Sequence, residues 1–170
     1  MEDVARILSI WLFCLVSVLL HELGHALGYR ISTGKAGWKA IAGSGPRLFS
    51  VSRCAFCLIP VGGYFIPGEE PKTKREKLMT MAGGPCVSLL LTALFGIVRL
   101  SVFGAAQPES GIHQILFQAS NFLLIFNFVQ FLSTAIPMRY RVICRGFESD
   151  GLQIVHALKE KENPDPFPEP

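Results

Sequence analysis

The segment His21-Glu22-Leu23-Gly24-His25 carries the clearest chemical signal in the chain, an HExxH motif. On a helix, residues four apart lie on one face, so both imidazoles can reach a single metal ion. Glu22 lies about 100° round from His21, close enough to touch a metal-bound water without being a ligand. Zinc lowers the pKa of such a water towards about 7, and a neighbouring carboxylate can then act as general base. The spacing predicts one zinc ion per chain, with His21 and His25 as ligands and Glu22 as the catalytic base.

The motif lies inside an apolar stretch, since the sequence IWLFCLVSVLL leads directly into His21. Two histidines and a glutamate within a membrane span are costly and usually mark a functional site. The alternative is a pair of hydrogen-bonded core histidines without a metal. One helical face of the stretch is small and polar, as a bundle-facing side should be. This face consists of Cys14, Ser17, His21, His25 and Gly28.

The composition is that of a membrane protein. The chain has 170 residues, a net charge of +3, 50% hydrophobic and 17% charged residues, and a mean hydropathy of +0.40. A soluble domain usually carries about 25% charged residues. The apolar content excludes a disordered chain, and the small charge excess excludes a basic nucleic-acid-binding domain. We therefore expect a lipid bilayer, and no nucleic acid, as its surroundings.

Three apolar stretches are long enough to span a bilayer, at about residues 7–29, 78–98 and 112–137. At 1.5 Å per residue, the second stretch is about 31 Å long, which matches a hydrocarbon core of about 30 Å. Lys and Arg concentrate between the first two stretches and after the third, whereas residues 101–111 contain neither. By the positive-inside rule, we expect the N-terminus outside and the C-terminus in the cytoplasm. The HExxH then lies in the cytoplasmic half of the membrane.

Residues 51–66 (VSRCAFCLIPVGGYFI) differ in character from the apolar stretches around them. β-Forming residues on both sides of Gly62 and Gly63 indicate a short hairpin or an edge strand with a bend. The segment is too apolar for a solvated loop, so we expect it to enter the bilayer against the helices. Its Cys54 and Cys57 form a CxxC, but no second pair completes a zinc site, and a strand would point the two thiols to opposite faces.

A catalytic zinc takes a third protein ligand and keeps one position open. The candidates are Asp150, His156, His113 and Glu148. His113 belongs to the outer end of the third stretch, on the wrong side of the membrane. His156 is expected on a face of an amphipathic C-terminal helix (GLQIVHALK), and an Asp directly before such a helix is ordinarily its N-cap. The predicted fold is thus mainly α: about three transmembrane helices, a short membrane-associated β segment and a C-terminal helix.

Four motifs together resemble the site-2 protease family of intramembrane zinc metalloproteases. They are the HExxH in a first span, PVGGY at residues 60–64, AGGP at residues 82–85 opening the next span, and a late SDG at residues 149–151. The resemblance covers roughly residues 7–158. It implies that Asp150 completes the zinc site of the two histidines and that Glu22 is the general base.

The resemblance also implies a site for an extended substrate. Gly62, Gly63 and Tyr64 resemble the membrane-inserted strand of the family, which is thought to pair with the substrate. Strand addition fits the physics, because a transmembrane helix must unwind before its peptide bonds can be reached.

Two positions depart from the family's pattern. Family members commonly show Gly-Pro-x-x-Asn at the second motif, where this chain has Ser88, and Asn-x-x-Pro before the aspartate, where it has Thr134 ahead of Pro137. On a helical wheel, Asn127, Gln130 and Thr134 cluster on one side of the third stretch. Asn127 lies about 15 Å from Pro137 along the helix, a depth comparable with the zinc site. We expect Asn127 to donate a hydrogen bond to an oxyanion or to the substrate, and ordinary interhelical bonding is the alternative.

These observations predict a zinc-dependent intramembrane endopeptidase that cleaves a transmembrane or membrane-proximal segment of a membrane-protein substrate. The alternative is a catalytically inactive zinc-binding membrane scaffold that binds or regulates a partner. A metal transporter ranks last, because the spans carry no further carboxylate to form a relay. We expect one domain over residues 1–162 and a disordered, Pro-rich tail over residues 163–170. The lack of a separate regulatory domain suggests control by a membrane partner.

Overall fold

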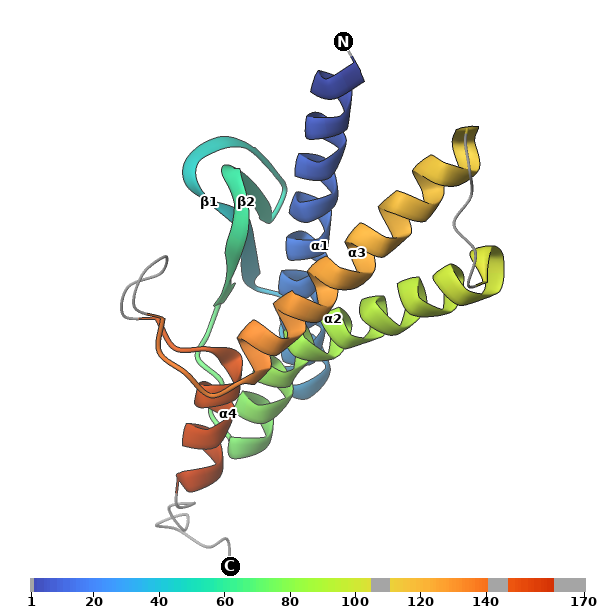
Figure 1. Ribbon diagram of the computed structural model, residues 1–170. Coiled ribbons are helices and arrows are strands. Elements are labelled where there is room, and N and C mark those ends of the chain that lie inside the picture. The colour runs from blue at the N-terminus through green and yellow to red at the C-terminus, as the bar shows by residue number, and fades with distance from the viewer. Residues whose placement is uncertain (1, 105–110, 141–146, 161–170) are drawn as a thin grey trace, which may run out of the picture.

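The computed structural model describes residues 2–104, 111–140 and 147–160. These residues form four helices: α1 (Glu2–Thr33), α2 (Lys74–Phe103), α3 (Gly111–Ala135) and α4 (Asp150–Lys159). Between α1 and α2, strands β1 (Trp38–Val51) and β2 (Cys54–Pro67) form one antiparallel hairpin. The mainly helical fold with a β segment and a C-terminal helix is as predicted (Figure 1). The tail predicted at residues 163–170 lies outside the described residues.

Helices α1, α2 and α3 are each long and apolar enough to cross a membrane. Helix α2 begins before its apolar part, at a capping box. The Thr73 hydroxyl accepts a hydrogen bond from the backbone N–H of Glu76 (3.2 Å), and the Glu76 carboxylate accepts one from the N–H of Thr73 (3.3 Å). Helix α3 ends at Ala135, two residues before Pro137, because proline disfavours helical backbone in the residue that precedes it.

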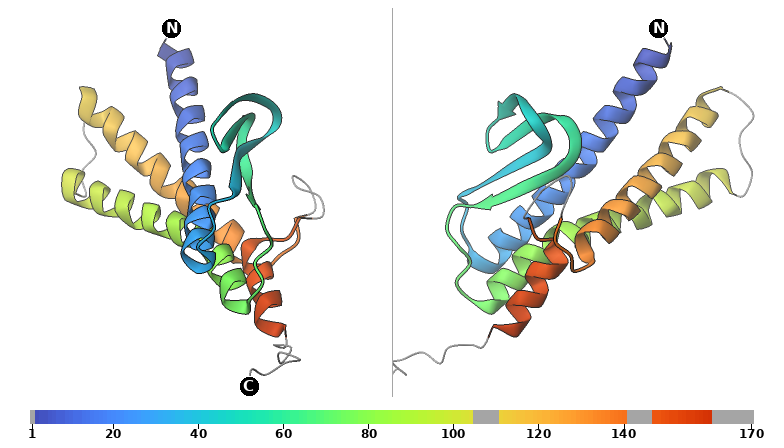
Figure 2. Two further views of the ribbon diagram at one scale, coloured as in Figure 1. Left: turned by 180° about the vertical axis from the view of Figure 1, so that it is seen from behind. Right: turned by 60° about the vertical axis from the view of Figure 1, so that its left-hand side comes forward.

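The three long helices come together at the end of the molecule near α4 and spread apart towards the N-terminus of α1 (Figures 1 and 2). Glycines allow α1 and α2 to approach closely where they cross. A Cβ on Gly24 would stand 2.8 Å from Val87 Cγ2, and a Cβ on Gly83 would stand 2.7 Å from the carbonyl carbon of Gly24. Contacts between small residues are the usual way in which membrane helices pack tightly.

The outer faces of these helices are apolar and uncovered within the described chain. In the most apolar window of α2, 6% of the residues are buried. Large apolar side chains therefore point outwards along most of the length of the helix, which suits lipid rather than water. Examples from the three helices are Ile7, Leu90, Ile97, Leu100, Ile115 and Ile125.

Of the two alternatives for residues 51–66, the hairpin that turns at Gly62 and Gly63 is wrong, and the edge strand with a bend fits the structure. Gly62 and Gly63 lie within a single strand, β2, and the turn of the hairpin is at residues 52–53, where Ser52 has a φ of 53°. The partner strand β1 was not expected from the sequence. Bulges interrupt its pairing with β2, and Gly43 and Gly45 adopt positive φ angles of 87° and 79°. Such bulges remove the two-residue alternation by which a strand is recognised in a sequence.

The hairpin packs along one side of α1 (Figure 2). The indole N–H of Trp11 donates a hydrogen bond of 2.7 Å to the carbonyl oxygen of Leu58 in β2. Leu15 and Val18 of α1 form a buried apolar cluster with Ala42 of β1. The β segment therefore rests on a helix that is apolar enough to cross a membrane.

Candidate functional site

Helix α1 buries the face that carries both histidines. Cys14, Ser17, His21, His25 and Gly28 are all buried, as the sequence pattern predicts for a bundle-facing side. The two imidazole rings lie edge to face, and their Nε2 atoms are 3.2 Å apart. The four-residue spacing of the motif thus brings two nitrogen donors together, as expected.

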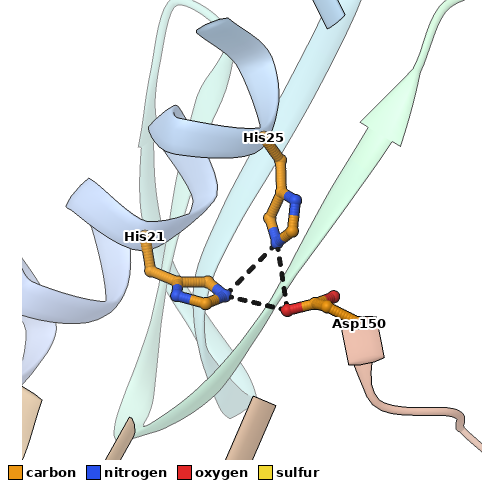
Figure 3. A group of neighbouring side chains, drawn as sticks. All are labelled: His21, His25 and Asp150. Carbon is orange, nitrogen blue, oxygen red and sulfur yellow. Dashed lines mark hydrogen bonds and ion pairs between the residues drawn. The ribbon is translucent and has the colours of Figure 1, made fainter. Parts of the chain in front are cut away.

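Asp150, the first residue of α4, brings a third donor to the same point (Figure 3). Its Oδ2 lies 3.2 Å from Nε2 of His21 and 3.4 Å from Nε2 of His25. The N-cap alternative for Asp150 is wrong, because Ser149 caps α4 by accepting a hydrogen bond from the backbone N–H of Leu152 (3.2 Å). Burial opposes ionisation of Asp150, but hydrogen bonds from the two imidazoles outweigh it and lower its pKa from 3.8 to about 2.

The other candidates for a third ligand do not converge with the two imidazoles. His156 is exposed on α4, and its Nδ1 lies 3.1 Å from a carboxylate oxygen of Glu148. Glu148 also pairs with Arg139 at 2.8 Å, and His113 is exposed in the first turn of α3. Within the described ranges, the one group of three or more His, Cys, Asp or Glu side chains with converging ligand atoms is His21, His25 and Asp150.

Helix α2 provides a hydrogen-bond partner for each imidazole. The Nδ1 of His25 lies 2.8 Å from the carbonyl oxygen of Thr80, and the Nδ1 of His21 lies 2.8 Å from Oγ of Ser88. Gly84 lies between them, and a Cβ there would stand 2.6 Å from Nε2 of His21. The HExxH spacing alone does not predict Thr80 or Ser88. The signal that points to them is their distance of four residues from Gly84 in the AGGP motif, which places all three on one face of α2.

The three donor atoms fit a zinc ion. They form a triangle with sides of 3.2, 3.2 and 3.4 Å. Zinc bound tetrahedrally at about 2.0–2.1 Å separates its ligand atoms by about 3.3 Å. Two imidazoles and a carboxylate are also a common protein donor set for catalytic zinc. His21, His25 and Asp150 could therefore hold one metal ion.

A cavity of about 620 Å³ opens beside the three donors. Its walls come from α1, β2, α3, α4 and the segment before α4, with Met81 from α2. Glu22 is 5% exposed, and its carboxylate reaches the cavity wall next to Gly63 of β2. Gly62 and Tyr64 line the same wall. The ring of Tyr64 contacts the ring of Phe147 at a centroid distance of 4.9 Å, which links β2 to the segment that precedes Asp150.

Asn127 is placed differently from the other predicted site residues. It is fully buried between helices, where its side-chain amide donates hydrogen bonds to Oγ of Ser17 in α1 (3.3 Å) and to the carbonyl oxygen of Leu123 (2.8 Å). The cavity wall includes Gln130 and Thr134 of the same polar cluster, but not Asn127. This geometry favours the interhelical alternative for Asn127. Gln130, one turn further along α3, lines the cavity instead. Depth along the helix alone did not distinguish Gln130 from Asn127 in the sequence.

A family model described as peptidase family M50 matches residues 9–161. The chain belongs to peptidase family M50. This is the site-2 protease family, as the four sequence motifs indicated, and the matched range contains the HExxH and Asp150. No curated protein and no solved structure matches the chain. The M50 chain is thus an integral membrane protein of a peptidase family, with three apolar helices and a His-His-Asp group able to bind a metal ion.

Proposed function

We propose that this M50 chain is a zinc-dependent endopeptidase that cleaves a transmembrane or membrane-proximal segment of a membrane protein. The observation that carries the proposal is the convergence of His21, His25 and Asp150 within 3.4 Å of one another beside a cavity. The cavity lies between helices with apolar outer faces. A substrate segment that enters it therefore comes from within or beside the bilayer. The Lys and Arg distribution supports a cytoplasmic C-terminus and an N-terminus outside.

Each polar group around the cavity has a distinct part in the proposed reaction. His21, His25 and Asp150 bind one zinc ion, which when bound polarises a carbonyl group and lowers the pKa of water. Glu22 accepts a proton from the attacking water. The water oxygen adds to the carbonyl carbon of the scissile peptide, and the C–N bond then breaks. Glu22 passes the proton to the leaving amine, so that one water is consumed for each bond cleaved.

Strand β2 is the proposed guide for the substrate. Within the described residues β2 pairs with β1 alone, and its residues 61–65 line the cavity. An unwound substrate segment can therefore add to β2 as a further strand beside Gly62, Gly63 and Tyr64. Gln130 of α3 also lines the cavity, and its side-chain oxygen is buried without a hydrogen-bond partner among the described residues. The Gln130 side chain is therefore a polar group of the cavity wall that can contact a substrate segment.

The test compares wild type with Glu22→Gln, which keeps the size of the side chain and removes the base. Both proteins are reconstituted in liposomes with candidate membrane proteins whose spans contain helix-breaking residues. We expect the wild type to cleave, a zinc chelator to stop it, and Glu22→Gln to be slower by about 10²–10⁴-fold with unchanged zinc content. Equal rates for the two proteins would show that the proposed mechanism is wrong. A Glu22→Gln variant that still supports the cellular role of the protein would favour the inactive zinc-binding scaffold.

A further inference from the structure

Helix α2 contacts the two imidazoles through a stripe of three residues, Thr80, Gly84 and Ser88. All three are buried, and they follow one another at intervals of four residues. His25 is opposite Thr80 and His21 is opposite Ser88, so α1 and α2 run in opposite directions at this point. The stripe gives each histidine one hydrogen-bond partner at Nδ1 and leaves space for both Nε2 atoms beside Gly84.

The two partners differ in their hydrogen-bonding capacity: a backbone carbonyl oxygen can only accept a hydrogen bond, whereas a serine hydroxyl can accept or donate one. A neutral imidazole carries its proton on one nitrogen, and a ring that binds a metal through Nε2 carries it on Nδ1. The carbonyl oxygen of Thr80 can only accept, so it fixes the proton of His25 on Nδ1. The hydroxyl of Ser88 can accept the same bond from His21, at 2.8 Å in a fully buried position. Unlike a backbone carbonyl, this acceptor can be removed by substitution.

We propose that Ser88 is a positioning residue of the metal site. By accepting the Nδ1–H of His21, it holds the proton on that nitrogen and turns Nε2 towards Asp150, and in doing so it raises the affinity of the site for zinc. This inference rests on the zinc site of the proposed function. Partners of this kind orient metal-binding histidines, and their loss typically weakens metal binding by about 10–100-fold.

The experiment measures zinc affinity on the purified full-length protein in detergent, by competition with a chromogenic chelator. We expect Ser88→Ala to bind zinc about 10–100-fold more weakly than wild type. Ser88→Thr keeps the hydroxyl and should restore most of the affinity, whereas Ser88→Cys, with its weaker hydrogen-bonding thiol, should be intermediate. The matched control is Ser120→Ala on α3. Among the described residues, the buried Ser120 hydroxyl donates a hydrogen bond within its own helix, to the carbonyl oxygen of Phe117.

A spectroscopic measurement separates positioning from general loosening of the fold. The Nδ1 atoms of His21 and His25 are buried and lie 2.8 Å from their partners on α2. In zinc-loaded protein labelled with ¹⁵N-histidine, both Nδ1–H groups should therefore give slowly exchanging ring signals. Ser88→Ala should shift or remove the His21 signal and leave the His25 signal in place, because Thr80 still accepts its hydrogen bond.

The outcomes are distinguishable from a failure of the proposed function. Equal zinc affinity in wild type, Ser88→Ala and Ser88→Cys, with both ring signals unchanged, would overturn the role of Ser88 and leave the protease proposal standing. If Ser88→Ala does not fold, the Thr and Cys variants decide the test. Zinc affinities equal to wild type in both variants, with an unshifted His21 signal in the Cys variant, would likewise overturn the role of Ser88. A wild-type protein that binds no zinc would instead overturn the proposed function itself.

Discussion

Gly63 of β2 lies directly against Glu22 of α1, so that a Cβ at position 63 would stand 2.9 Å from both Cγ and Cδ of the glutamate. The carboxylate occupies its place in the cavity wall because residue 63 has no side chain. The strand that we propose as the guide for the substrate is therefore also the element that positions the proposed base. A substrate segment that pairs with β2 at Gly63 would therefore lie next to the carboxylate of Glu22.

Gly63→Ala should reduce turnover while leaving the metal site intact. The new methyl group would meet the side chain of Glu22 rather than backbone, so we expect the side chain of Glu22 to shift. Displacing a general base from its working position should lower the rate at least about 10-fold. Turnover of a membrane substrate and zinc content per chain are the two measurements. Gly37→Ala is the control, because a Cβ there meets only Gly68 at an ordinary distance of 3.8 Å. Wild-type turnover in Gly63→Ala would contradict the assigned contact.

Gly84→Ala should weaken zinc binding by at least about 10-fold, a loss of the size found when the surroundings of a metal ligand are disturbed. A Cβ at this position would lie 2.6 Å from Nε2 of His21 and 2.7 Å from Cδ2 of His25, within the space that the donor atoms need. Gly96→Ala provides the comparison on the same helix, because its nearest neighbour would be Leu124 Cδ1 at 3.7 Å. Zinc titration of the two variants checks the difference, and equal affinities would argue against the donor geometry.

Asp150→Ala should abolish or greatly weaken zinc binding, since it removes one of the three proposed ligands. We expect about one zinc per wild-type chain and less than a tenth of that occupancy in the variant at the same free zinc concentration. Glu148→Gln is the matched neighbour, because Glu148 pairs with Arg139 and His156 at the cavity edge and does not meet the two imidazoles. Full zinc retention by Asp150→Ala would remove this residue from the metal site.

Asn127 and Gln130 should respond differently to substitution. Asn127→Ala removes a buried hydrogen bond between α3 and α1, and we expect a loss of about 1–3 kcal/mol in stability with turnover per folded molecule unchanged. Gln130→Leu keeps a similar size and removes a polar group of the cavity wall, so we expect a higher KM with unchanged zinc content. Thermal unfolding measures the stability of each variant, and steady-state kinetics measures its turnover and KM. A fall in turnover of Asn127→Ala, with normal kinetics of Gln130→Leu, would reverse the assignment.

The long helices and the two histidines could be predicted from the sequence because both depend on local spacing. Three apolar stretches of sufficient length predict three membrane helices. In the structure the first two helices extend beyond the predicted bounds at both ends, and the third spans residues 111–135 where 112–137 was predicted. His21 and His25 are one helical turn apart, so their meeting follows from helix geometry alone. Strand β1 could not be predicted in the same way, because Gly43, Gly45 and the bulges break the alternation that marks a strand.

The sequence by itself determined the donor types, their helix and the apolar setting of the site. Asp150 lies 129 residues from His21, and residue spacing alone left its role open between a ligand and an N-cap. The partnership of Ser88 with His21, and the choice of Gln130 rather than Asn127 for the cavity wall, were decided only by the tertiary structure. The physical reason is that a helix's own periodicity sets which residues share a face, whereas the crossing of one helix on another sets what each face meets. Here the glycines at the α1–α2 crossing set that rotation and distance.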